Sequence, residues 1–261
     1  MARGGGRMSG LPSGAVTFLF TDIEGSTRLV KALRERYAEV LAEHQRLIRA
    51  AIATHAGHEV DTQGDAFFAA FGGAKQAVLC ALDIHRALAA QDWPESVQIR
   101  VRIGIHTGQA VAAGGRYTGL AVHRAARICA VADGGQVLIS QATQDLIEDE
   151  EEELGFALVD MGEHRLKDLD RPVRLFQLTA VGLDPASRRP GVRGHRGRGG
   201  WGARAAADAD QLQRQERAGP RRGWPAGAAP AGEGDRASRF GQDPAREDPG
   251  MGASFASRTA G

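Results

Sequence analysis

The first pattern along the chain is a short apolar run that ends on acidic and hydroxyl residues. Residues Val16–Phe20 are mostly β-branched or aromatic, which predicts a buried strand. The segment 21–27, TDIEGST, follows directly, and we expect Ser26 or Thr27 to cap the next helix. Helical periodicity then continues, with a break, through residues 37–55.

The rest of the patterned region alternates between strand and helix periods. Residues 58–71 predict two strands around a turn at Gly64–Asp65, and residues 74–90 predict an amphipathic helix. The later elements are a strand at 97–106, a helix at 119–132 ended by Gly134–Gly135, a strand at 136–140, a short helix at 141–147 and a last strand at 173–179. The order β-α-β-β-α-β with additions predicts a ferredoxin-like α+β fold.

Composition divides the chain into three parts. We expect a disordered N-terminus at 1–13, a folded domain at 14–181, and a low-complexity disordered tail at 182–261, which is rich in Gly, Arg, Ala and Pro. The net charge of +1 neither supports nor opposes a nucleic-acid partner, and we find no direct DNA-binding motif. No membrane span and no secretory signal are recognised, which predicts a soluble cytoplasmic protein. Cys80 and Cys129 lie in helical patterns, where core packing is expected.

Two aspartates are placed where predicted strands end. Asp22 follows the buried strand, where an unpaired carboxylate would be costly, and Asp65 lies in the turn of the strand pair. If that pair lies beside the first strand, the carboxylates converge; two carboxylates completed by phosphates and water are a usual way to hold Mg²⁺. The start of the helix after DIEGST suits phosphate oxygens. A phosphate-bound divalent metal is therefore predicted; the alternative is a helix cap at Asp22 and an ordinary turn residue at Asp65.

Five segments, in this order, resemble one known family. FTDIEGST, QGDAFFAAF, RIGIHTG, GLAVHRAARI and MGEHRLKDL together are similar to the class III adenylate/guanylate cyclase catalytic domain, over residues 14–181. The resemblance implies a homodimer with sites at the subunit interface. It implies conversion of ATP or GTP, with ATP expected, to a 3′,5′-cyclic nucleotide and pyrophosphate, with two Mg²⁺ or Mn²⁺ ions per site.

The resemblance also implies roles for individual residues. The metal ligands would be Asp22, Asp65 and Ile23, in a two-metal in-line displacement. Arg127 would stabilise charge on the transferring phosphoryl group and Lys167 would contact the triphosphate, both from the opposite chain. The alternatives are a solvated helix face for Arg127 and an ordinary surface position for Lys167. The substrate-binding turn would comprise Gly25, Ser26 and Thr27.

Three positions depart from the family pattern. Asp61 stands where adenylate cyclases of this class usually have a lysine, Arg116 where they have an aspartate, and His123 where they have an asparagine. In one interpretation, Asp61 and Arg116 read the base with exchanged roles and His123 replaces the asparagine as a donor. In the other, the domain is a catalytically weak or inactive module that serves dimerisation or nucleotide sensing in transcriptional regulation, and Asp61 and Arg116 form a weak ion pair.

The tail suggests a link to a second protein class. Residues Asp235–Arg246, back-translated with G/C-rich codons and read one base later, give TGPRGSGKTRLA, which fits the phosphate-binding loop of P-loop ATPases. We therefore interpret the tail as an out-of-frame remnant. Cyclase-like domains with these motifs often stand at the N-terminus of P-loop ATPase transcriptional regulators in bacteria. An ordinary disordered tail is the alternative.

Overall fold

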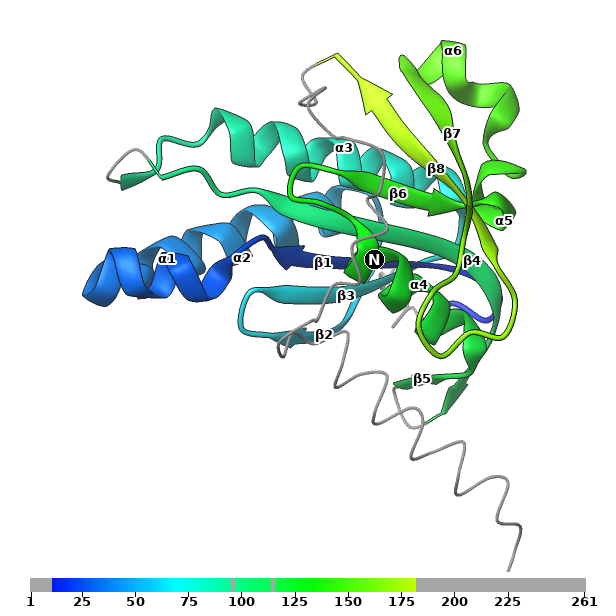
Figure 1. Cartoon of the computed structure of the whole chain (residues 1–261), viewed down its shortest axis with the longest axis horizontal. Coiled ribbons are helices and arrows are strands. Elements are labelled where there is room, and N and C mark those ends of the chain that lie inside the picture. Colours follow the sequence, from blue (N-terminus) through cyan, green and yellow to red (C-terminus); the bar gives the residue numbers. More distant parts are fainter. Residues whose placement is uncertain (1–10, 95–96, 114–115, 182–261) are drawn as a thin grey trace, which may run out of the picture. The chain divides into compact units, whose positions relative to one another are not determined.

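The computed structural model describes residues 11–94, 97–113 and 116–181 (Figure 1). Its centre is a mixed sheet in the order β2-β3-β1-β4-β6-β8-β7, with the short β5 paired to β4. The strands are β1 (Gly14–Ile23), β2 (His58–Gln63), β3 (Ala66–Phe71), β4 (Val101–Ala113), β5 (Arg116–Thr118), β6 (Val137–Ser140), β7 (Phe156–His164) and β8 (Val173–Ala180). The α-helices are α1 (Ser26–Leu33), α2 (Tyr37–Thr54), α3 (Ala74–Ala90), α4 (Leu120–Val131), α5 (Gln141–Gln144) and α6 (Glu151–Leu154), and the 3₁₀ helices are η1 (Arg34–Arg36) and η3 (Glu148–Glu150).

The predicted α+β fold is confirmed. β1 is central and antiparallel to both β3 and β4, and β2 is antiparallel to β3. This arrangement of the first four strands, with helices between β1 and β2 and between β3 and β4, is the split βαβ pattern expected from the sequence.

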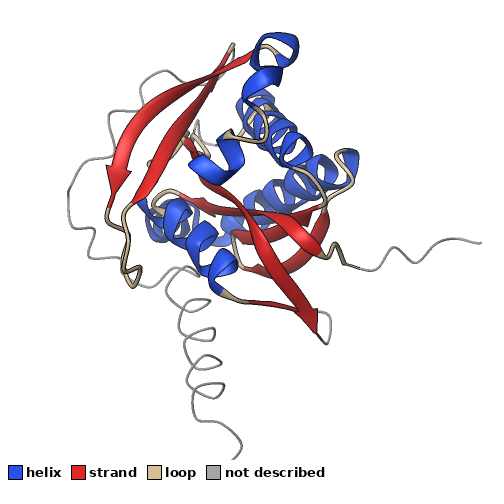
Figure 2. Cartoon of the chain, turned by 90° about the vertical axis from the view of Figure 1, so that its right-hand side faces the viewer, coloured by secondary structure: helices blue, strands red, loops and turns tan. Residues whose placement is uncertain are grey.

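β1 reads as an unbroken apolar run because both of its faces are buried. Leu19 and Ile23 belong to the core formed with α2 and α3, whereas Val16, Phe18 and Phe20 belong to the core formed with α4. Figure 2 shows helices on both sides of the strands. Successive side chains of a strand point to opposite faces, so one apolar segment supplies two cores and fixes the position of Asp22 at its end.

Several predicted boundaries were wrong. Neither Ser26 nor Thr27 caps α1, which begins after Gly25 in a left-handed conformation (φ 69°) with no side-chain cap bond. The predicted break in the helical segment is confirmed, and it is the 3₁₀ turn η1 before α2. α4 ends at Val131 because Ala132 is extended, before the two glycines that we expected to end it.

The strand β7 was missed. It is an edge strand, and of its residues only Phe156 is fully buried. An edge strand that lies largely in solvent lacks the alternation by which strands are recognised in a sequence.

The core role predicted for the two cysteines is confirmed. Cys80 and Cys129 are buried free thiols, and burial raises the pKa of each to about 12. In the described parts of the chain, no helix is long and apolar enough to cross a membrane. The predicted tail at 182–261 and the first ten residues lie outside the described residues.

Two buried histidines make the fold sensitive to acid. His44 is 0% exposed, and burial lowers its pKa to about 4; His106 is also buried, and burial followed by the charge of Arg124 lowers its pKa to about 3. A histidine whose pKa is lowered by folding binds a proton more readily in the unfolded state. Its contribution to stability is therefore complete above the unfolded pKa of 6.5 and is lost as the pH falls toward the folded pKa.

We therefore expect the free energy of unfolding to fall between pH 6.5 and 4.5, by up to about 1.4 kcal/mol per pH unit for each histidine. Urea denaturation of His44→Leu should show a slope with pH that is smaller by about one proton. Asp65, whose pKa is raised, changes stability in the opposite direction and does so equally in both proteins. The same slope in both proteins would contradict the neutral state of His44.

Candidate active site

Asp22 and Asp65 are brought together, as the sequence predicted. Asp22 is the second-last residue of β1, and Asp65 follows Gly64 in the two-residue turn between β2 and β3. The Ile23 N–H donates to Asp65 Oδ2 over 3.3 Å, which holds the second carboxylate beside the end of β1. Two segments separated by 42 residues therefore meet at one end of the central strand.

The electrostatics of this pair favour a cation. Burial, followed by the negative charge of Asp22, raises the pKa of Asp65, while hydrogen bonds from Ser26 and the Ile23 N–H act in the opposite direction. Burial, then Asp65 and Asp22, also raise the pKa of Tyr37, which begins α2 and lies near both carboxylates. A bound cation would relieve these repulsions.

The donor set fits Mg²⁺ or Mn²⁺ with a phosphate ligand. No group of three or more His, Cys, Asp or Glu side chains suited to a metal occurs among the residues that the structure describes. Two carboxylates leave most of an octahedron to water and phosphate, which is the usual arrangement for Mg²⁺. Asp22, Asp65 and the main chain at Ile23 are the groups that could hold such an ion.

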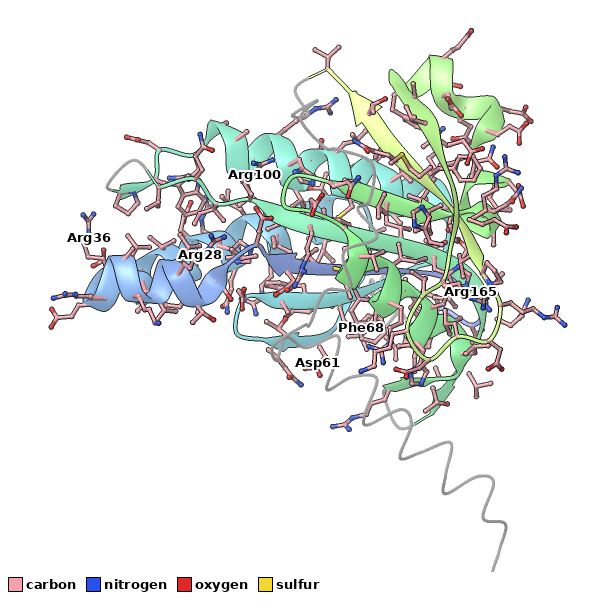
Figure 3. The ribbon with its side chains drawn as sticks, viewed as in Figure 1. Arg28, Arg36, Asp61, Phe68, Arg100 and Arg165 are labelled. Atoms are coloured by element: carbon pink, nitrogen blue, oxygen red, sulfur yellow. The ribbon has the colours of Figure 1, made fainter. Side chains whose placement is uncertain are left out.

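The turn after β1 is shaped by Gly25. Its φ of 69° favours glycine, and a Cβ at this position would lie 2.7 Å from the Nη2 atom of Arg28, so a side chain would also meet that guanidinium. Ser26 begins α1, and Thr27 is exposed one residue later. In Figure 3, Arg28 lies toward the end of the sheet at which β1 finishes, together with Arg100.

Sequence reasoning missed Arg102. This residue of β4 lies directly opposite Asp22 in the strand register, and its Nε donates to Asp22 Oδ2 over 3.0 Å while its Nη2 contacts the same oxygen. Both side chains are largely buried, at 21% and 17% exposed. This pair could be predicted only from the register of β1 against β4, and the sequence of either strand alone does not give that register. Arg102 therefore already neutralises part of the charge that Asp22 could offer to a metal.

Neutralising Arg102 is expected to strengthen metal binding. Arg102→Gln frees Asp22 and removes a nearby positive charge, so the Kd for Mn²⁺ should fall by roughly 5- to 30-fold, as for a partly buried charge interaction of about 1–2 kcal/mol. The metal-free thermal midpoint should also fall, because the two carboxylates then repel without compensation. Titration with Mn²⁺, followed by electron paramagnetic resonance of the free ion, measures the change. Weaker Mn²⁺ binding by Arg102→Gln would instead indicate that Arg102 holds the Asp22 carboxylate in position.

Arg127 lies on α4 and is only 9% exposed. It forms an ion pair with Asp168, whose side chain is 61% exposed and which stands in the turn between β7 and β8 with a φ of 61°. Lys167 is the exposed neighbour of Asp168. The predicted arginine is thus not an ordinary solvated residue, and its partner Asp168 was not predicted.

The three residues that depart from the family pattern are not joined in this chain. Asp61 is exposed on the edge strand β2, where its Oδ1 accepts a bond from the Thr62 N–H over 2.8 Å, and Figure 3 shows it pointing outward. Arg116 is exposed on β5, and His123 is half-buried on α4. Within the described chain, Asp61 and Arg116 form no ion pair with each other, so the weak pair considered from the sequence is not present.

The fold and the paired carboxylates define an α+β domain with a candidate site for a divalent cation. The family described as the adenylate and guanylate cyclase catalytic domain matches residues 10–180. The chain belongs to this family.

Individual relatives agree with this assignment. An uncharacterized protein of Mycobacterium tuberculosis is 38% identical over 169 residues, which cover 64% of this chain and 56% of that protein. The receptor-type adenylate cyclase B of Leishmania donovani is 33% identical over 220 residues, covering 68% of this chain and 16% of that protein. This chain therefore matches little more than half the length of the mycobacterial relative.

Solved structures share the fold. One structure from a study of adenylate cyclases of Trypanosoma brucei in their monomeric state has a TM-score of 0.62 and 27% identity, and covers 70% of this chain and 96% of that chain. The adenylate/guanylate cyclase/hydrolase from Silicibacter pomeroyi has a TM-score of 0.56 and 32% identity, and covers 62% of this chain and 95% of that chain.

Proposed function

We propose that this domain is a nucleotidyl cyclase that converts ATP to 3′,5′-cyclic AMP and pyrophosphate in signalling. The observation that carries the proposal is the convergence of Asp22 and Asp65 beside the start of α1, where burial and the charge of Asp22 raise the pKa of Asp65. Such a site is completed by a cation and an anionic ligand, and a nucleoside triphosphate with its divalent metal supplies both. The adenylate cyclases among the relatives support ATP over GTP.

In this reaction the ribose 3′-oxygen forms a bond to the α-phosphorus, and the bond from that phosphorus to the leaving pyrophosphate breaks. The two metal ions, when bound, supply activation of the 3′-hydroxyl and neutralisation of the triphosphate. Asp22, Asp65 and the main chain at Ile23 hold them. The turn 25–27 donates N–H groups to phosphate oxygens.

A homodimer completes the site. Arg127 of the partner subunit stabilises the negative charge that develops on the transferring phosphoryl group, and Lys167 of the partner subunit contacts the triphosphate. In the single chain Arg127 is held by Asp168, so its guanidinium has to exchange one anionic partner for another. Asp61 and Arg116, both exposed in the single chain, are free to face a base bound between subunits.

A second candidate is a regulatory module without turnover, part of a P-loop ATPase transcriptional regulator. It is favoured by two ion pairs, since Arg102 binds Asp22 and Asp168 binds Arg127 within one chain. In this case the pairs stabilise the domain, and Asp61, Arg116 and His123 mark a site that has lost its base-reading residues.

The purified protein, incubated with ATP or GTP in Mn²⁺ or Mg²⁺ and assayed by mass spectrometry of the product, separates the two functions. Cyclic AMP formation supports the cyclase. If the wild type makes no cyclic nucleotide, the triple variant Asp61→Lys, Arg116→Asp, His123→Asn restores the usual base-reading pattern and should gain activity. A folded, metal-binding triple variant without activity would leave the regulatory module as the better description.

A further inference from the structure

Asp65 is half-buried in the two-residue turn between β2 and β3, and the helix α2 supports this turn from one side. Gly64, the residue before Asp65, has a φ of 61°, and its carbonyl accepts a hydrogen bond from Gln45 Nε2 over 2.7 Å. Gln45 is a half-buried residue in the middle of α2. The hydrogen bond joins the turn to an 18-residue helix across 19 residues of sequence.

The orientation of the Gln45 amide is itself fixed. Its Oε1 accepts a bond from Arg49 Nη1 over 3.2 Å, one turn further along α2. Arg49 in turn donates to both carboxylate oxygens of Glu59 on β2, over 2.9 and 3.1 Å. Because Arg49 is a donor only, the amide oxygen has to face it, and the amide nitrogen is left to face the carbonyl of Gly64.

The same helix also holds the strand that follows Asp65. The ring of Phe67 on β3 packs edge-on against the buried ring of His44, with centroids 6.1 Å apart, and the Arg49 guanidinium lies 5.2 Å from the centroid of Phe67. Asp65 thus stands between two residues, Gly64 and Phe67, that α2 holds in place.

We propose that Gln45 is a positioning residue for the metal carboxylate Asp65. Through the carbonyl of Gly64 it sets the angle at which the turn presents this carboxylate to the end of β1. The inference rests on the proposed function, because it assigns a task to Gln45 only if Asp65 binds a metal. It extends that function to a residue outside the five cyclase-like segments of the sequence.

The test measures the Kd for Mn²⁺ of folded, nucleotide-free protein, by electron paramagnetic resonance of the free ion. Gln45→Met keeps the length and helix propensity of the side chain but removes both the donor to Gly64 and the acceptor for Arg49. Gln45→Glu keeps the acceptor for Arg49, also removes the donor to Gly64, and adds a negative charge. We expect both variants to bind Mn²⁺ about 5- to 10-fold more weakly, the factor that corresponds to the loss of one hydrogen bond.

The matched control is Arg46→Lys, because Arg46 is the next residue of α2, its charge is kept, and among the described residues it pairs with Glu43 of the same helix, over 2.6 Å. Its Kd should equal that of the wild type. A purely structural Gln45 would lower the thermal midpoint and leave the Kd, measured well below the midpoint, unchanged. Added charge alone would make Gln45→Glu bind Mn²⁺ more tightly, so weaker binding by this variant separates positioning from electrostatics.

The possible failures are distinguishable. If Gln45→Met and Gln45→Glu bind Mn²⁺ as the wild type does while Asp65→Asn binds it weakly, the role of Gln45 is wrong and the metal site stands. If Asp65→Asn also binds Mn²⁺ as the wild type does, the assignment of the metal site is wrong, and the proposed role of Gln45 is wrong as well.

Discussion

Asp65→Asn is expected to give a folded protein that has lost Mn²⁺ binding and at least ~10³-fold of the proposed cyclase activity. Asparagine has nearly the same shape and can still accept the bond from the Ile23 N–H, so the turn should be kept. The loss of Mn²⁺ binding is expected because the negative charge of the carboxylate is removed. Asp22→Asn should have the same effect on activity, because we propose that the two carboxylates hold the metal together.

The stability of the metal-free Asp65→Asn protein should change in the opposite direction from its activity. Burial and the charge of Asp22 raise the pKa of Asp65, so the ionised carboxylate is unfavourable in the folded state. Removing it should raise the metal-free thermal midpoint and abolish the further rise that Mn²⁺ produces in the wild type. Asp145→Asn, which makes the same change at an exposed carboxylate, is the control and should alter neither quantity. Full turnover by Asp65→Asn would exclude it as a metal ligand.

Arg127→Ala is expected to lower the rate by on the order of 10²–10³-fold with little change in Mn²⁺ affinity, since the proposed role of the arginine is on the phosphoryl group and not on the metal. A mixture of inactive Asp22→Ala and inactive Arg127→Ala should then recover activity. In the mixed dimer, one of the two sites takes its carboxylates from the Arg127→Ala chain and its arginine from the Asp22→Ala chain, so it contains no substitution.

Two controls make this mixing experiment decisive. Subunit exchange has to be shown directly, by labelling the two variants with different fluorophores. Asp168→Asn should remain active, because it removes an ion pair that Arg127 forms within its own chain and leaves Arg127 itself unchanged. Proven exchange without recovered activity would contradict a site shared between subunits.

The sequence was sufficient for the features that depend on local pattern. The run at 16–20 predicted β1, the repeat at 74–90 predicted α3 with its observed limits, and the turn at Gly64–Asp65 was placed correctly. The convergence of Asp22 and Asp65 could also be predicted, because it needs only that the hairpin lie beside β1. Each of these features follows from periodicity or from the order of the elements.

The missed features of the site depend on which residues face each other across elements. Arg102 meets Asp22 through the register of two strands, Asp168 meets Arg127 through a turn on the edge of the sheet, and Gln45 meets the hairpin from a helix. A shift of one residue in the β1–β4 register would turn Arg102 to the other face. No single segment of the sequence shows which residues lie opposite each other. These three partners were therefore found only in the structure.

Because β7 lies at the edge of the sheet, two parts of the proposed site should differ in how easily they open: the end of β1 with Asp22, and the pair of Arg127 and Asp168. Asp22 is attached to a strand that is hydrogen-bonded on both sides, so its amides should exchange with solvent only when the whole domain unfolds. The turn that carries Lys167 and Asp168 joins the outermost strand to its neighbour, and such an edge can open by itself at a lower free energy. The end of β1 that carries Asp22 should therefore stay in place, whereas Arg127 can be released from Asp168 by an opening that leaves the rest of the sheet intact.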